Sequence, residues 1–222
     1  MDYTAWANKN KKRIAREFIR KTQFQSKEVP TGIFTAGLPG AGKTEFTVEL
    51  LKQIADTPLR IDMDEIAKLI DNYRSEVADK FRGGASAILA KIYDETIKNK
   101  IDFVFDGTFS QARALENLER ALHHGYKVKV YYIHQLPEVA WQFTKDRELI
   151  EHRAIDRVGF IDTYLKLEQN LRKLCFLHKD VTISLIGKDG HNKEGRRVED
   201  IKDLFSELPS FLTEEQLKSV VT

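Results

Sequence analysis

Residues 37–44 of the sequence read GLPGAGKT, which fits the spacing G-x-x-x-x-G-K-[ST] at every fixed position. Glycines let the backbone wrap so that successive N–H groups point at phosphate oxygens, and the N-terminus of a following helix adds partial positive charge. Lys43 is expected to neutralise the β- and γ-phosphates, and the Thr44 hydroxyl to ligate Mg²⁺. The alternative is a glycine-rich turn without nucleotide. The residues predicted to bind a nucleoside triphosphate are Gly37, Leu38, Pro39, Gly40, Ala41, Gly42, Lys43 and Thr44.

The segments on either side of this loop match the strand and the helix that such a loop requires. The apolar run GIFTA (32–36) precedes it, and the helical pattern EFTVELLKQIA (45–55) follows. Further apolar runs alternate with charged segments that have apolar residues at three- and four-residue spacing. This alternation predicts an α/β protein of the P-loop NTPase and kinase type, with about five parallel strands and helices on both faces of the sheet. The other four predicted strands are residues 58–62, 101–107, 126–134 and 181–187.

Length, charge and cysteine content narrow the class of protein. The chain has 222 residues, enough for one domain over residues 1–222. Its 36 Lys and Arg residues nearly balance 34 Asp and Glu, which does not favour a general nucleic-acid binder. The longest uncharged stretch, residues 29–42, is too short to span a membrane, and the first residues lack the apolar run of a signal peptide. One cysteine allows no intrachain disulfide, so we expect a cytoplasmic protein.

The two ends of the chain each predict a helix. Residues 1–28 are strongly basic, and Ile14 and Phe18 lie one helical turn apart, so one side of this helix could dock on the domain. One interpretation of these charges is contact with an acidic partner, RNA or a membrane surface. The alternative is an ordinary helix face exposed to water. Residues 207–222 predict a short C-terminal helix capped near Thr213.

Two aspartates follow the second predicted strand. Asp62 and Asp64 in RIDMD lie where the carboxyl end of the strand turns into a helix, the edge at which open α/β sheets bind ligands. One carboxylate could accept a proton from an acceptor hydroxyl, while the other orients the substrate or assists Mg²⁺. The alternative is that the pair caps the next helix.

The third predicted strand ends in a similar way. In FVFDGT three apolar residues lead to Asp106, the form of a Walker B carboxylate that holds Mg²⁺ directly or through water. Gly107 would let the backbone approach a ligand, and Thr108 supplies a hydroxyl at the rim of the site. The alternative is an ordinary Asp-Gly turn.

Three arginines, Arg147, Arg153 and Arg157, lie between the fourth and fifth predicted strands. In a kinase such a segment forms a lid that clamps the transferring phosphoryl group. Acidic neighbours such as Glu148 could pair with these arginines instead and give a plain salt-bridged helix.

The ordered combination of GLPGAGKT, IDMDEI, FVFDGTFS and the arginine-rich segment resembles the zeta toxin family of P-loop kinases over about residues 10–190. The resemblance implies that Asp64 is the general base, that Asp106 and Thr108 contact the substrate, and that Arg147 with Arg153 or Arg157 stabilises the phosphoryl group. Two departures concern the acceptor side: Ser110 stands where many relatives have arginine, and residues 83–90 lack the acidic contact often found there.

The resemblance also implies a function. The best-known members phosphorylate a hydroxyl of UDP-N-acetylglucosamine and are held silent by a small antitoxin. We therefore expect an ATP- or GTP-dependent, Mg²⁺-requiring kinase whose acceptor is a small molecule such as a nucleotide sugar, acting as the toxin of a toxin–antitoxin pair. The alternatives are a kinase of another acceptor, namely a polynucleotide 5′-hydroxyl, NAD or another small molecule, and a nucleotide-dependent switch or binding module.

Overall fold

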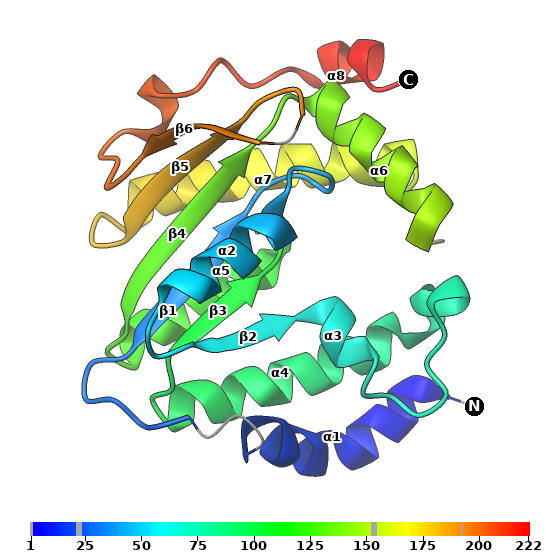
Figure 1. Ribbon diagram of the computed structural model, residues 1–222, viewed down its shortest axis with the longest axis vertical. Coiled ribbons are helices and arrows are strands. Elements are labelled where there is room, and N and C mark those ends of the chain that lie inside the picture. The colour runs from blue at the N-terminus through cyan, green and yellow to red at the C-terminus, as the bar shows by residue number, and fades with distance from the viewer. Residues whose placement is uncertain (1, 21–23, 152–154, 192) are drawn as a thin grey trace.

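The structure is a computed structural model that describes residues 2–20, 24–151, 155–191 and 193–222. The described residues form one six-stranded sheet with the order β2-β3-β1-β4-β5-β6 (Figure 1). Neighbouring strands are parallel from β2 to β5, which confirms the predicted fold. The strands are β1 (Thr31–Ala36), β2 (Leu59–Asp62), β3 (Phe103–Asp106), β4 (Lys127–His134), β5 (Thr182–Lys188) and β6 (Glu194–Val198).

The strand β6 is an addition to the five predicted ones. It pairs antiparallel with β5 at the edge of the sheet. Its sequence, EGRRV, is charged and largely exposed, so it carries no apolar run from which a strand could be predicted. Charged side chains on an exposed edge oppose pairing with a second chain.

Helices cover both faces of the sheet (Figure 1). On one face Phe46 packs on Tyr131, and on the other Tyr93 packs on Phe103. The register of the strands shows that these are opposite faces. Phe103 is the partner of Gly32 in β1, and Tyr131 is the partner of Thr35. Side chains alternate between the two faces along a strand, so residues an odd number of positions apart point to opposite faces. The α-helices are α1 (Tyr3–Arg20), α2 (Lys43–Gln53), α3 (Met63–Ala67), α4 (Arg82–Lys98), α5 (Ala112–His123), α6 (Pro137–Glu151), α7 (Arg157–Leu177) and α8 (Glu214–Val220), with 3₁₀ turns η1 (Ser75–Phe81) and η2 (Leu204–Ser206).

The N-terminal helix α1 packs along α4, outside the sheet (Figure 1). Ala7 and Ile14 are buried in this contact. A Cβ atom on Gly84 would lie 2.8 Å from the carbonyl oxygen of Tyr3, so the glycine allows the two helices to approach closely. The glycines of α4 therefore have a packing role. The exposed residues of α1 include the basic side chains of Lys9, Lys12, Arg13, Arg16 and Arg20.

The C-terminal helix α8 begins at a capping box in which Thr213 and Gln216 each accept a hydrogen bond from the other's backbone N–H. Its residue Leu217 is fully buried. The indole Nε1 of Trp141 in α6 donates to the carbonyl oxygen of Thr222 at 2.8 Å. The end of the chain is thereby attached to α6.

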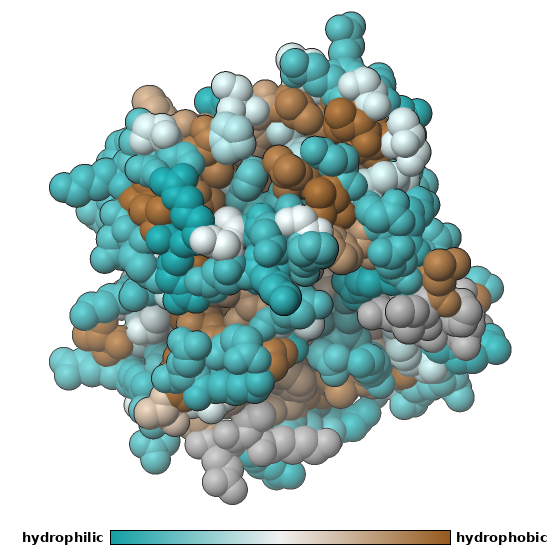
Figure 2. All heavy atoms as spheres, turned by 45° about the horizontal axis from the view of Figure 1, so that its top comes forward, coloured by the Kyte–Doolittle hydropathy of each residue, from teal (hydrophilic) through white to brown (hydrophobic). Residues whose placement is uncertain are grey.

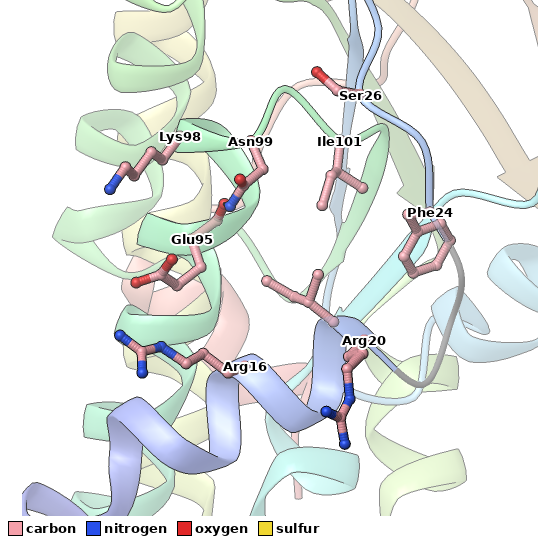
Figure 3. A pocket seen from close by; sticks show the side chains of 9 residues that line it. Arg16, Arg20, Phe24, Ser26, Glu95, Lys98, Asn99 and Ile101 are labelled. Atoms are coloured by element: carbon pink, nitrogen blue, oxygen red, sulfur yellow. The ribbon is translucent and has the colours of Figure 1, made fainter.

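A cavity of about 450 Å³ lies between the C-terminal ends of α1 and α4 (Figure 3). Its lining includes Ile101 and Ser26, which precede β3 and β1. The cavity is therefore at the amino ends of the strands, whereas the phosphate loop follows the carboxyl end of β1.

Hydrophilic residues cover most of the face seen in Figure 2, with apolar side chains in small groups between them. Within the described parts of the chain, no helix is long and apolar enough to cross a membrane.

Candidate nucleotide-binding and catalytic site

The loop between β1 and α2 is shaped by glycines. Gly40 has a φ of +78°, and a Cβ atom there would lie 2.1 Å from the carbonyl oxygen of Ala140 in α6. Gly42, with a φ of +80°, is the N-cap of α2, and among the described residues no side chain caps this helix. Because the first N–H groups of a helix have no partner within it, they suit an anion. The loop thus has the local form that a phosphate site requires.

Lys43 lies at the start of α2 and folds back over the loop. Its Nζ donates to the carbonyl oxygen of Leu38 at 2.6 Å. Burial lowers the pKa of Lys43 to about 8, although the negative charge of Asp106 opposes this effect, and nearby Arg147 lowers the pKa further. Lys43, Asp106 and Arg147 are therefore close enough to interact. The neighbouring Thr44 is exposed at the beginning of the helix.

Asp62 and Asp106 are partners in the register of β2 and β3, at the carboxyl ends of both strands. A single nitrogen of Arg60, Nη2, lies 2.8 Å from the Oδ2 atom of each aspartate. The Oδ1 atom of Asp106 accepts a hydrogen bond from Thr35 at 3.2 Å. Arg60 and Thr35 were not predicted as site residues, because their contacts depend on which strands are neighbours.

Asp62 also caps α3. Its Oδ1 accepts hydrogen bonds from the backbone N–H groups of Asp64 at 2.8 Å and Glu65 at 3.0 Å. Burial raises the pKa of Asp62, and the cap and Arg60 oppose this rise. Asp64 is half-buried in the first turn of α3, so the helix determines its place. The alternative interpretation, a helix cap, is therefore correct for Asp62. Asp64 does not cap the helix and lies in its first turn, at the carboxyl edge of the sheet.

The loop after β3 is attached to the phosphate loop and to α7. The carbonyl oxygen of Thr108 accepts a hydrogen bond from the N–H of Gly37 at 3.2 Å, and its hydroxyl lies 2.7 Å from that of Ser110. Between them, Phe109 has a φ of +62°, a left-handed conformation that costs free energy outside glycine. Asn170 in α7 donates its amide to the carbonyl oxygen of Phe109 at 2.8 Å and so holds this loop.

The three predicted lid arginines have different surroundings. Arg147 is exposed on α6 and close enough to Lys43 to affect its pKa. Arg153 lies outside the described residues. Arg157 is the first residue of α7, and its guanidinium donates to the carbonyl oxygens of Val221, at 2.6 Å, and of Lys218. In this arrangement Arg157 binds the C-terminal end of α8.

A mostly parallel sheet, a glycine-rich phosphate loop after its first strand and aspartates at the carboxyl ends of two adjacent strands define a P-loop, kinase-like protein. The profile of the zeta toxin family matches residues 15–199. The chain belongs to the zeta toxin family, as its sequence motifs predicted.

Solved structures share the fold at low sequence identity. A structure from the PezAT chromosomal toxin–antitoxin system of Streptococcus pneumoniae has a TM-score of 0.70 and 16% identity, covering 100% of this chain and 90% of that one. AvrRxo1-ORF1:-ORF2 with ATP has a TM-score of 0.55 and 15% identity, with 88% and 63% covered. The Pnkp1/Rnl/Hen1 RNA repair complex has a TM-score of 0.52 and 14% identity, with 82% and 51% covered. No curated protein matches the chain by sequence.

Proposed function

We propose that the protein is an ATP- or GTP-dependent kinase that transfers the γ-phosphoryl group to a hydroxyl of a small-molecule acceptor. The observation that carries this proposal is that hydrogen bonds join the phosphate loop to the end of β3. Thr35, at the end of β1, donates to Asp106, and the N–H of Gly37 donates to the carbonyl oxygen of Thr108. Asp106 is in register with Asp62, which caps the α3 helix that carries Asp64. Nucleotide-side and acceptor-side groups thus lie at one edge of the sheet. The family implies UDP-N-acetylglucosamine as the leading acceptor, and one of the structures that share the fold was solved with ATP.

The residues present fit a Mg²⁺–nucleotide complex. The uncapped start of α2 and the left-handed Gly40 and Gly42 form a cradle for phosphates, and Thr44 is exposed beside it. Thr44 and Asp106 would hold Mg²⁺, which neutralises charge between the phosphates. Both oxygens of Asp106 already accept hydrogen bonds, so this carboxylate would act through its remaining lone pairs or through water.

In the proposed reaction Asp64 takes the proton of the acceptor hydroxyl as its oxygen forms a bond to the γ-phosphorus. The bond from this phosphorus to the bridging oxygen breaks, and the nucleoside diphosphate leaves. Lys43 and Arg147 stabilise the negative charge on the transferred group. Asp62 and Thr108 are proposed to contact the acceptor. Arg153 and Arg157 remain further candidates for the clamp, although Arg157 would have to leave α8 to take part.

We also propose that the protein is a toxin held silent by a small antitoxin. The support is family membership, together with the fold shared with a protein of the PezAT toxin–antitoxin system.

The test is incubation of the purified protein with ATP or GTP, Mg²⁺ and a panel of UDP-sugars, followed by mass spectrometry. A gain of one phosphate on UDP-N-acetylglucosamine that Asp64→Asn abolishes supports the leading proposal. Phosphate on a polynucleotide 5′-end or on NAD would keep the kinase and replace its acceptor. A polynucleotide is included because α1 has exposed basic side chains. Affinity for a polynucleotide acceptor would fall steeply as the salt concentration rises. Absence of any phosphorylated product would favour a switch or binding module.

A further inference from the structure

Arg60 occupies an unusual position for a charged side chain in a parallel strand. It lies in β2, its side chain is 24% exposed, and its Nε is buried without a hydrogen-bond partner among the described residues. A buried donor that is left without a hydrogen bond destabilises the folded state. Packing of the strand therefore does not account for Arg60, whereas its contacts with charged partners do.

The contacts of Arg60 join two parts of the site. Its Nη2 binds one oxygen of Asp62 and one of Asp106, each at 2.8 Å. The second oxygen of Asp62 caps α3, the helix that carries Asp64. The second oxygen of Asp106 binds Thr35, at the end of the strand that leads into the phosphate loop. One guanidinium group therefore connects the acceptor-side helix with the nucleotide-side carboxylate.

Charge makes this connection necessary for the observed geometry. Asp62 and Asp106 are in-register neighbours on adjacent strands, and their side chains are only 12% and 4% exposed. Like charges that face each other across adjacent strands are destabilising, and partial burial strengthens the repulsion. Without a cation between them the two carboxylates would move apart, and the α3 cap would move with Asp62.

We propose that Arg60 is a positioning residue that fixes the start of α3, and with it Asp64, relative to Asp106 and the phosphate loop. Arg60 acts through Asp62 and needs no contact with either substrate. For its effect on turnover this inference rests on the proposed function, but the restraint on α3 is a property of the folded protein by itself.

The test compares Arg60→Met and Arg60→Lys with wild type. The matched control is Arg120→Met, which removes an arginine–aspartate pair, Arg120 with Asp94 at 2.6 Å, near the amino end of β4. The first readout is amide hydrogen exchange of the peptide covering residues 62–67, measured by mass spectrometry. We expect at least about tenfold faster exchange in Arg60→Met, because the cap is loosened, and unchanged exchange in Arg120→Met.

The second readout separates kcat from nucleotide affinity. Arg60→Met should lower kcat by about 10²-fold, the cost of a misplaced catalytic group, and leave the nucleotide Kd within about threefold. Arg60→Lys should recover part of the loss, as should added guanidinium ion with Arg60→Met. If amide exchange of residues 62–67 in Arg60→Met is as slow as in the wild type, Arg60 does not restrain α3. If kcat and nucleotide affinity fall by the same factor, Arg60 does not act specifically on α3. If the wild type phosphorylates no acceptor, the proposed function fails, and the exchange readout still decides the role of Arg60.

Discussion

The ammonium nitrogen of Lys43 lies 2.6 Å from the carbonyl oxygen of Leu38, within the loop where the phosphates are proposed to bind. This contact holds the ammonium group inside the loop. Burial leaves Lys43 with a pKa of about 8, so its charge titrates near neutral pH.

We predict that nucleotide affinity falls as the pH rises above 8. Phosphates bind the protonated amine, so the nucleotide affinity is highest well below pH 8. Above pH 8 the affinity decreases by up to about tenfold per pH unit, because the protonated fraction of Lys43 decreases. Binding near pH 8 should take up a fraction of a proton, which calorimetry in buffers of different ionisation enthalpy measures. Lys43→Arg should show a flat profile, because guanidinium stays charged. An equally steep profile in Lys43→Arg would assign the titration to another group.

Lys43→Ala should lose activity altogether, because the positive charge that neutralises the phosphates is removed.

Asp64→Asn should separate chemistry from binding. The amide keeps the size of the side chain and removes the proton acceptor, so kcat should fall about 10²–10⁴-fold, with the nucleotide Kd nearly unchanged. Glu65→Gln is the control: Glu65 is the next residue in α3, is exposed and pairs with Lys68 at 2.7 Å. Turnover of Asp64→Asn close to wild type would show that Asp64 is not the base.

Gly40→Ala should damage the phosphate loop. The added Cβ would lie 2.1 Å from the carbonyl oxygen of Ala140, at a backbone φ of +78°. The left-handed conformation alone costs about 1–3 kcal/mol, and each kcal/mol lowers the Tm by about 2–4 °C in a chain of this size. Calorimetry should show a lower Tm and nucleotide titration a weaker Kd. Gly190→Ala, where nothing lies within 4 Å of the added atom, should change neither.

Arg157→Met distinguishes a structural role from a catalytic one. Loss of the hydrogen bonds to α8 should lower stability by about 1 kcal/mol, a fall of about 2–4 °C in Tm, with kcat within about threefold of wild type. Lys166→Met, which removes an exposed pair with Asp162 on the same helix, should leave the Tm nearly unchanged. A fall of kcat of about 10²-fold at unchanged Tm would instead place Arg157 in the phosphoryl clamp.

The parts of the fold that the sequence predicted are those with local signals. GLPGAGKT, the apolar strands and Asp106 after FVF each depend on residues close together in the chain. The strand β6 has no apolar run, and it forms because β5 offers an open edge.

The site residues that escaped prediction depend on contacts distant in sequence. Arg60 and Asp106 are 46 positions apart and meet only because β2 and β3 are neighbours. Asn170 reads as an ordinary polar residue of a long helix, yet it is buried and holds the backbone of Phe109, 61 positions away. Such pairs require the strand order and helix packing, which no local pattern contains.

The hydrogen bond from Trp141 to the carbonyl oxygen of Thr222 also provides an optical reporter for this protein. Trp141 belongs to α6, whose residue Ala140 lies against Gly40 of the phosphate loop. The chain has only two tryptophans, and the other, Trp6, is in α1. In a Trp6→Phe variant the tryptophan emission therefore comes from α6 alone. If a bound nucleotide displaces that helix, the hydrogen bonding of a single indole ring changes, and its emission wavelength changes with it, without any added label.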